Sequence, residues 1–195
     1  DLPLATAEIE AVARGLEGFG PGRVDLVQPA EGGVRVIVRP AAPARTRPDG
    51  APATAEGAAG ADTRAARSRG GRPGRRGPAA RTARPPRAPE DPTAREVVVE
   101  TVGDRRFVVD AGGFWQVHRL AAETLTDAVG DALRDAGVDP EAWHLDLYGG
   151  VGLLAAAVGA AGGPATRVTS VESDPRATEH AGENLAEWVG ARAET

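Results

Sequence analysis

Residues 144–154, His-Leu-Asp-Leu-Tyr-Gly-Gly-Val-Gly-Leu-Leu, determine how this chain of 195 residues is organised. The segment has the pattern of a short apolar strand, a glycine turn and the start of an alanine-rich helix. A strand that leads through a glycine turn into a helix is how α/β folds receive nucleotide-like ligands. The sequence therefore predicts an α/β domain with a ligand site at this turn.

The kind of ligand depends on Asp146. Residues 150–155 fit the pattern G-x-G-x-x-G/A of NAD-binding proteins. A carboxylate just before the turn would repel a pyrophosphate, whereas the sulfonium and ammonium groups of S-adenosyl-L-methionine (SAM) would be attracted to it. Glu172 lies 20 residues after Gly152, at the end of a second strand-like run, where a carboxylate would meet ribose hydroxyls. These residues favour SAM as the ligand. The alternatives are NAD, or a turn that binds no ligand and whose glycines serve only close packing.

The composition excludes several classes of site. The chain contains no Cys and no Met, and all 23 basic residues are Arg. A Walker P-loop needs Lys, and disulfides, thiolate nucleophiles and zinc knuckles need Cys, so we expect none of these and no metal site. No run of about 18 apolar residues is present, which predicts a cytoplasmic protein without a membrane segment. Because the chain starts at Asp1 without Met, we expect a fragment of a longer protein.

The net charge of −5 conceals an uneven distribution. Residues 63–89 carry nine Arg and no acidic residue, whereas the rest of the chain carries 14 Arg and 28 acidic residues. This basic tract lies in residues 41–93, a segment rich in Ala, Pro, Gly and Arg that we predict to be a disordered linker. Its guanidinium groups could attract RNA phosphates, but no aromatic residue interleaves with them, which favours a solvated insertion.

The rest of the chain predicts two structured regions. Residues 1–40 have the pattern of a short helix over 6–16, with Thr6 as its N-cap, and two strands over 24–27 and 34–38, as part of a central α+β region. Residues 94–195 begin with a hairpin that turns at Gly103-Asp104. A helix over 119–137, with Leu120, Leu125 and Leu133 on its apolar face, then precedes the strand–turn–helix motif. A further strand over 167–172 leads into a helix that starts at Asp174-Pro175 and whose core face includes Trp188 and Val189.

Three segments in this order resemble the RNA (uracil-5-)-methyltransferase family, which makes 5-methyluridine in tRNA and rRNA. They are 114–118 (FWQVH), 146–153 (DLYGGVGL) and 171–185 (VESDPRATEHAGENL). The family pattern has F-F-Q-x-N, then D-L-Y/F-x-G-x-G, then V-x-x-V/I-E and an A-x-x-N-A helix. The resemblance implies the N-terminal half of a Rossmann-like SAM-dependent methyltransferase domain over 94–195, incomplete at its C-terminal end.

The resemblance also implies roles for individual residues. Gln116 would contact SAM, Tyr148 would lie against it and Glu172 would hold its ribose. Gly150 would let the backbone approach the cofactor, and Asp146 would lie near its methionine end. Two positions depart from the family pattern: His118 replaces the usual Asn, and Leu153 stands where Thr or Asn is common.

In the family mechanism a Cys thiolate adds to uracil C6, C5 takes the methyl group of SAM, and a carboxylate removes the C5 proton. The nucleophile and the base would lie C-terminal to the segments seen here, so we expect no catalytic residue in this chain. The expected partner is tRNA or rRNA, and we expect a monomer. The alternatives are an NAD-binding oxidoreductase and a catalytically silent RNA-binding protein that uses the Arg tract.

Overall fold

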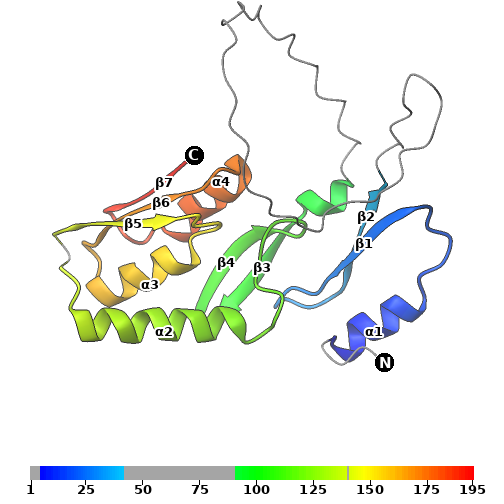
Figure 1. The fold of residues 1–195 in the computed structure, drawn as a ribbon, viewed down its shortest axis with the longest axis horizontal. Coiled ribbons are helices and arrows are strands. Elements are labelled where there is room, and N and C mark those ends of the chain that lie inside the picture. The colour runs from blue at the N-terminus through cyan, green and yellow to red at the C-terminus, as the bar shows by residue number, and fades with distance from the viewer. Residues whose placement is uncertain (1–4, 42–90, 140) are drawn as a thin grey trace, which may run out of the picture. The chain divides into compact units, whose positions relative to one another are not determined.

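We describe residues 5–41, 91–139 and 141–195 in a computed structural model. Most of the predicted linker, including the Arg tract, lies outside the described residues. The described residues up to Pro40 and from Asp91 onward form one compact unit. Figure 1 shows their elements in chain order.

The N-terminal region follows the sequence prediction. Helix α1 (Ala7–Arg14) precedes strands β1 (Gly22–Val27) and β2 (Arg35–Pro40), which pair antiparallel. Thr6 caps the helix by accepting a hydrogen bond from the amide of Ile9 at 3.2 Å, because the first amides of a helix lack partners within it. The predicted helix and both strands are therefore confirmed.

The second hairpin is also where the sequence placed it. The short 3₁₀ helix η1 (Pro92–Arg95) leads into β3 (Val97–Val102) and β4 (Arg105–Asp110), which pair antiparallel around the two-residue turn Gly103-Asp104. Asp91 accepts a hydrogen bond from the amide of Val38 at 2.8 Å, so the residues before β3 are tied to β2.

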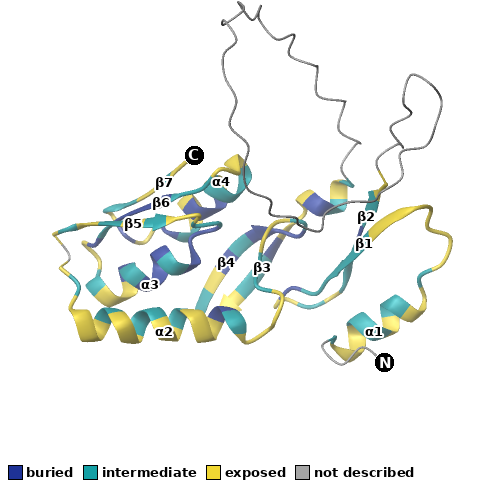
Figure 2. Cartoon of the chain, in the orientation of Figure 1, coloured by how far each residue is buried: buried dark blue, intermediate teal, exposed yellow. Residues whose placement is uncertain are grey.

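Helix α2 (Ala121–Ala136) was predicted, but its buried face was predicted wrongly. Leu120 and Leu125 are exposed, whereas Ala122 is buried and Val129 is half-buried. Figure 2 shows much of the outer side of α2 exposed. The five alanines of this helix lie on one side together with Leu125, Val129 and Leu133, but how much of that apolar side is covered depends on α3, which packs against only part of it.

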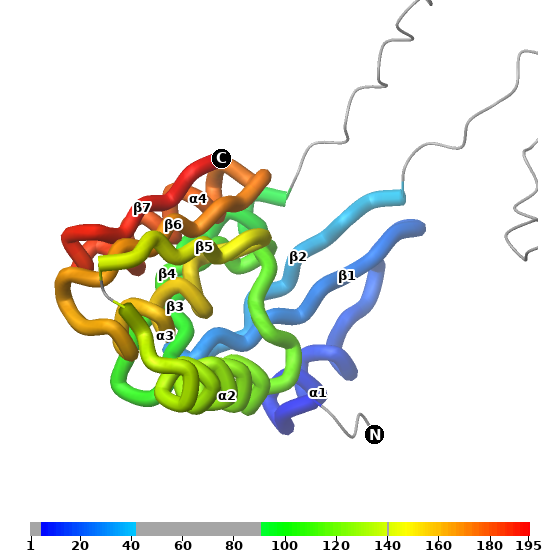
Figure 3. The backbone as a smooth tube through the Cα atoms, turned by 60° about the vertical axis from the view of Figure 1, so that its left-hand side comes forward, coloured from blue at the N-terminus to red at the C-terminus, as the bar shows by residue number. Residues whose placement is uncertain are grey.

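The C-terminal region is a parallel α/β layer. Strands β5 (Trp143–Leu147), β6 (Arg167–Val171) and β7 (Ala191–Glu194) form a parallel sheet in the order β5-β6-β7. Helices α3 (Leu153–Gly162) and α4 (Pro175–Asn184) connect them. Figures 1 and 3 show α3 between the sheet and α2. Strands linked by crossover helices in this way define the Rossmann-like α/β class, and that prediction is confirmed.

Strand β7 was not predicted, and the last helix is shorter than its apolar pattern suggested. The pattern placed Val189 in the core of a continued helix, but α4 ends at Asn184 and Val189 is 95% exposed. The chain instead passes close to Thr166 at Gly190, where an added Cβ would lie 2.6 Å from the carbonyl oxygen of Thr166. Trp188 is buried, as predicted.

Two hydrophobic clusters meet at the glycine turn. Val151 packs with Ile37, Val98 and Val109 from the hairpins, whereas Leu153 packs with Phe107, Val168 and Trp188. Trp115 contacts both clusters, and its ring centroid is 5.6 Å from that of Phe107. Apolar packing on both sides therefore holds the glycine turn in place without a ligand.

Candidate functional site

The candidate site is a small pocket above the glycine turn. Its volume is about 130 Å³. It is lined by residues 114–116, by Leu125 of α2 and by residues 146–151, 153 and 154; we call the first segment the Gln116 wall and the last the glycine wall. Four of the five predicted site residues line it: Gln116, Asp146, Tyr148 and Gly150. The structure thus brings together two segments that lie 30 residues apart in the sequence.

Asp146, on β5, is directed at the beginning of α3. Its Oδ2 atom accepts a hydrogen bond from the amide of Ala155, in the first turn of α3, at 3.1 Å. Burial raises the pKa of the Asp146 carboxyl above its usual 3.8, and the Ala155 amide and the Ser170 hydroxyl oppose that rise. The protein's own carboxylate therefore lies at the helix N-terminus, the position that binds phosphate in dinucleotide sites.

Glu172 lies just after β6 and reaches back to the glycine turn. Its Oε2 atom accepts a hydrogen bond from the amide of Gly150 at 3.1 Å, and its Oε1 atom accepts one from the amide of Asp174 at 2.9 Å. The Asp174 amide contributes most to lowering the pKa of Glu172, with further help from Gly150 and Ser173. The carboxylate is therefore ionised at neutral pH and held beside the pocket by backbone donors.

The backbone of the turn is shaped by its glycines and by one strained residue. An added Cβ at Gly149 would collide with the Ser170 hydroxyl and lie 2.9 Å from Oδ2 of Asp146. Gly150 adopts φ +55°, and an added Cβ there would face open space, so the backbone is accessible at this point.

Tyr148 has φ 61° and is the single non-glycine residue with positive φ among the described residues. A left-handed backbone at such a residue costs about 1–2 kcal/mol. The Tyr148 side chain is 91% exposed at the pocket edge. Strain of this kind and an exposed ring together mark the turn as a candidate functional segment.

Part of the pocket lies outside the predicted site residues. Trp115 and Val151 line it within the quoted motifs but have no role in the family pattern. Leu125 and Leu154 line it from outside those motifs. The predicted residue Gln116 is half-buried and lines the pocket next to Trp115. A larger, open groove of about 760 Å³ lies over the β3–β4 turn and α4, and it contains none of the predicted site residues.

Two other kinds of site were sought. Within residues 5–41, 91–139 and 141–195, no group of three or more His, Asp or Glu side chains is placed to hold a metal ion. None of the helices in this described part is long and apolar enough to cross a membrane.

Comparison with known proteins gives partial matches. A protein of Streptomyces coelicolor named as an uncharacterized RNA methyltransferase is 44% identical over 100 residues, and one of Streptomyces avermitilis with the same name is 43% identical over 100 residues. The chain is a homologue of proteins named RNA methyltransferases. This confirms the predicted relationship at that level, and each match covers 51% of this chain.

The homologues are much longer than the matched segment, since this chain spans only 21% and 22% of their length. No family model matches the chain. Among solved structures, the Pyrococcus abyssi tRNA (uracil-54, C5)-methyltransferase in complex with S-adenosyl-L-homocysteine (SAH) is similar with a TM-score of 0.41 and 22% identity. That similarity covers 51% of this chain and 24% of the archaeal one.

Proposed function

We propose that the pocket at the glycine turn of this RNA methyltransferase homologue binds SAM. The observation that carries the proposal is the carboxylate of Asp146 at the N-terminus of α3, bonded to the Ala155 amide. This carboxylate takes up the helix amide that a phosphate would use, and its charge favours a cationic ligand. When bound, SAM supplies a methyl group activated by its sulfonium.

The residues present fit this ligand. Glu172 is ionised and fixed beside Gly150, so it can accept hydrogen bonds from ribose hydroxyls. Gly150 leaves open space next to the backbone, and Tyr148 presents an exposed ring at the pocket edge. The pocket of about 130 Å³ encloses only part of such a ligand, so the remainder would extend over Tyr148 and past Gln116.

The alternatives are less well supported. An NAD-binding oxidoreductase would place a pyrophosphate where Asp146 already lies, and like charges at that distance repel. A catalytically silent RNA-binding protein would depend on the Arg tract of residues 63–89, which lies outside the described residues.

The proposed reaction is methylation of uridine C5 in tRNA or rRNA. The three ordered motifs support it, together with homologues named RNA methyltransferases. The reaction needs a thiolate, and this chain contains no Cys. We therefore expect the 195-residue chain alone to yield no 5-methyluridine, and detection of that product from this chain would contradict the proposed mechanism.

The direct test is calorimetric titration of the chain with SAM, SAH and NAD. Saturable binding of SAM and SAH, and none of NAD, is the expected result. Tight binding of NAD with no response to SAH would overturn the proposal.

A further inference from the structure

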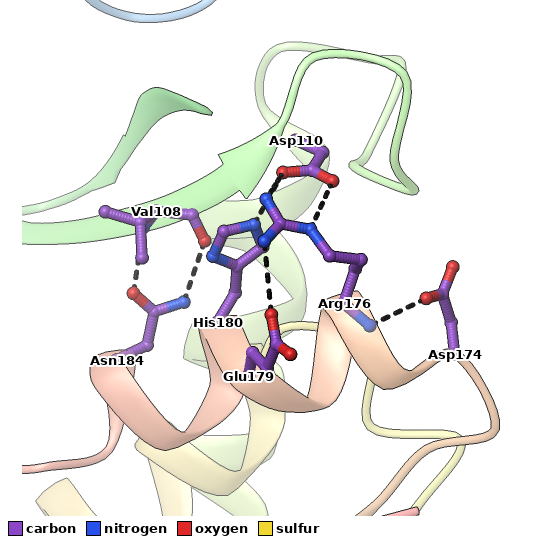
Figure 4. A network of polar contacts seen from close by, with 7 residues as sticks. All are labelled: Val108, Asp110, Asp174, Arg176, Glu179, His180 and Asn184. Atoms are coloured by element: carbon purple, nitrogen blue, oxygen red, sulfur yellow. Dashed lines mark hydrogen bonds and ion pairs between the residues drawn. The ribbon is translucent and has the colours of Figure 1, made fainter. Parts of the chain in front are cut away.

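Helix α4 joins strand β4 to the glycine turn through one side chain, Asn184. Its Oδ1 atom accepts a hydrogen bond from the amide of Val108 at 2.8 Å. Its Nδ2 atom donates to the carbonyl of Val108 at 3.0 Å and to the carbonyl of Val151 at 2.9 Å. Figure 4 shows Asn184 facing the backbone of Val108 on β4.

These two partners belong to, or lead to, two different segments that line the pocket. Val151 lies within the glycine turn, between Gly150 and Gly152. Val108 lies on β4, which ends at Asp110, and residues 111–113 connect that strand to the wall formed by residues 114–116. One amide therefore joins the glycine wall to the strand that leads into the Gln116 wall.

Other contacts of α4 make this connection rigid. Asp110, at the end of β4, accepts hydrogen bonds from Arg176 at 2.7 Å and 3.1 Å, and one of its oxygens lies 2.7 Å from Nε2 of His180 (Figure 4). Leu185, next to Asn184, packs under Gly152, where an added Cβ would lie 3.2 Å from its side chain. Asn184 is thus held from both sides and has little freedom to follow a displaced wall.

We propose that Asn184 is a positioning residue, which sets the separation of the two pocket walls and so the affinity for the cofactor. This inference rests on the proposed function, because it assigns Asn184 to the same pocket. Asn184 does not line the pocket, so it acts through the carbonyl of Val151 and the backbone of Val108.

Asn184→Asp tests this with almost no change of shape. The new oxygen would face the carbonyl oxygens of Val108 and Val151, to which Nδ2 now donates. We expect SAH affinity to fall about tenfold in the folded chain, as expected for losing hydrogen bonds of this kind. Ala181→Gly is the matched control: it destabilises the same helix at a buried position, so its melting temperature should fall while its affinity stays unchanged.

Two further readouts separate positioning from mere stability. At acidic pH a protonated Asp side chain at this position can donate one hydrogen bond, so the affinity of Asn184→Asp should recover toward wild type, relative to wild type at the same pH. Hydrogen exchange of the Gly152 amide, bonded to the Gly149 carbonyl at 2.9 Å in the turn, should accelerate in Asn184→Asp and not in Ala181→Gly.

The outcomes are distinguishable from those of the proposed function. If the wild-type chain binds no SAH, the proposed function fails. The exchange rate of the Gly152 amide alone then decides whether Asn184 sets the separation of the two walls. Unchanged affinity and unchanged exchange in Asn184→Asp would overturn the inference. If that variant does not fold, Asn184→Ser, which adds no charge, is measured against the same two criteria.

Discussion

One carboxylate lies near the end of β5 and another just after β6, and their surroundings shift their pKa values in opposite directions. Asp146 is partly buried, and burial raises its pKa, whereas backbone amides lower the pKa of the more exposed Glu172. Both accept hydrogen bonds from backbone amides near the glycine turn, Asp146 from Ala155 in the first turn of α3 and Glu172 from Gly150. The pKa values of two acids at one glycine turn are therefore shifted in opposite directions, which is typical of groups with different tasks.

The difference follows from what each acid faces. Asp146 lies under the turn beside the apolar start of α3, so its charge is costly unless a cation comes near. Glu172 meets three donors at the edge of the pocket, so its charge is stable without a ligand. We infer that Glu172 is a fixed acceptor, and that Asp146 responds to the charge of the bound molecule.

The largest effect should come from Glu172→Gln. The variant loses a charged acceptor for ribose and weakens the bond to the Gly150 amide, and hydrogen bonds to charged groups contribute about 1.5–3 kcal/mol, or roughly tenfold to a hundredfold in affinity. The affinities for SAM and for SAH should fall by the same factor, as measured by calorimetry. Glu183→Gln, an exposed acid on α4, serves as the control, and equal affinities in both variants would remove Glu172 from the site.

A smaller but still marked effect is expected from Gly149→Ala. The added methyl group would displace the Ser170 hydroxyl and press on Asp146, and overpacking of this kind costs about 1–3 kcal/mol. The melting temperature should fall. The affinity for SAM should fall more than the affinity for SAH, because the added methyl group displaces the Asp146 carboxylate. A Gly149→Ala variant with wild-type stability would show that the turn tolerates a Cβ at this position and would contradict the proposed overpacking.

Asp146→Asn should separate the two acids most cleanly. Asn keeps an acceptor for the Ala155 amide but removes the charge, so SAM, with its sulfonium, should weaken by about tenfold and SAH by much less. Because burial penalises the ionised form of Asp146, stability at neutral pH should be unchanged or higher. Asp135→Asn, on the exposed side of α2, is the control. Equal losses for SAM and SAH would contradict the assigned role.

The smallest effect, a few-fold change, should appear with pH. The raised pKa of Asp146 means that it loses its charge first as pH falls toward its usual 3.8, while the lowered pKa of Glu172 keeps that acid ionised. The preference for SAM over SAH should therefore decline with falling pH in the wild type. In Asp146→Asn the ratio of the two affinities should stay flat, and a parallel decline there would assign the effect to another group.

Local patterns predicted much of the fold because their causes are local. The hairpin at Gly103-Asp104, the Thr6 cap and the Asp174-Pro175 helix start each depend on a few adjacent residues, and all three are present. The packed face of α2 and the existence of β7 depend on which other segments come near, and both were missed. In the candidate site, Asp146, Gly150 and Glu172 stand out in the sequence, whereas Asn184 shows its contacts only in three dimensions.

The sequence by itself determined that a carboxylate precedes a glycine turn between a strand and a helix, because spacing along a strand and into a helix is fixed by backbone geometry. Only the tertiary structure decided that the carboxylate reaches the amide of Ala155, that Glu172 bonds to Gly150 and that Asn184 joins β4 to the glycine turn. Those contacts link residues between 9 and 76 positions apart, and their geometry depends on packing between elements, which no local pattern encodes.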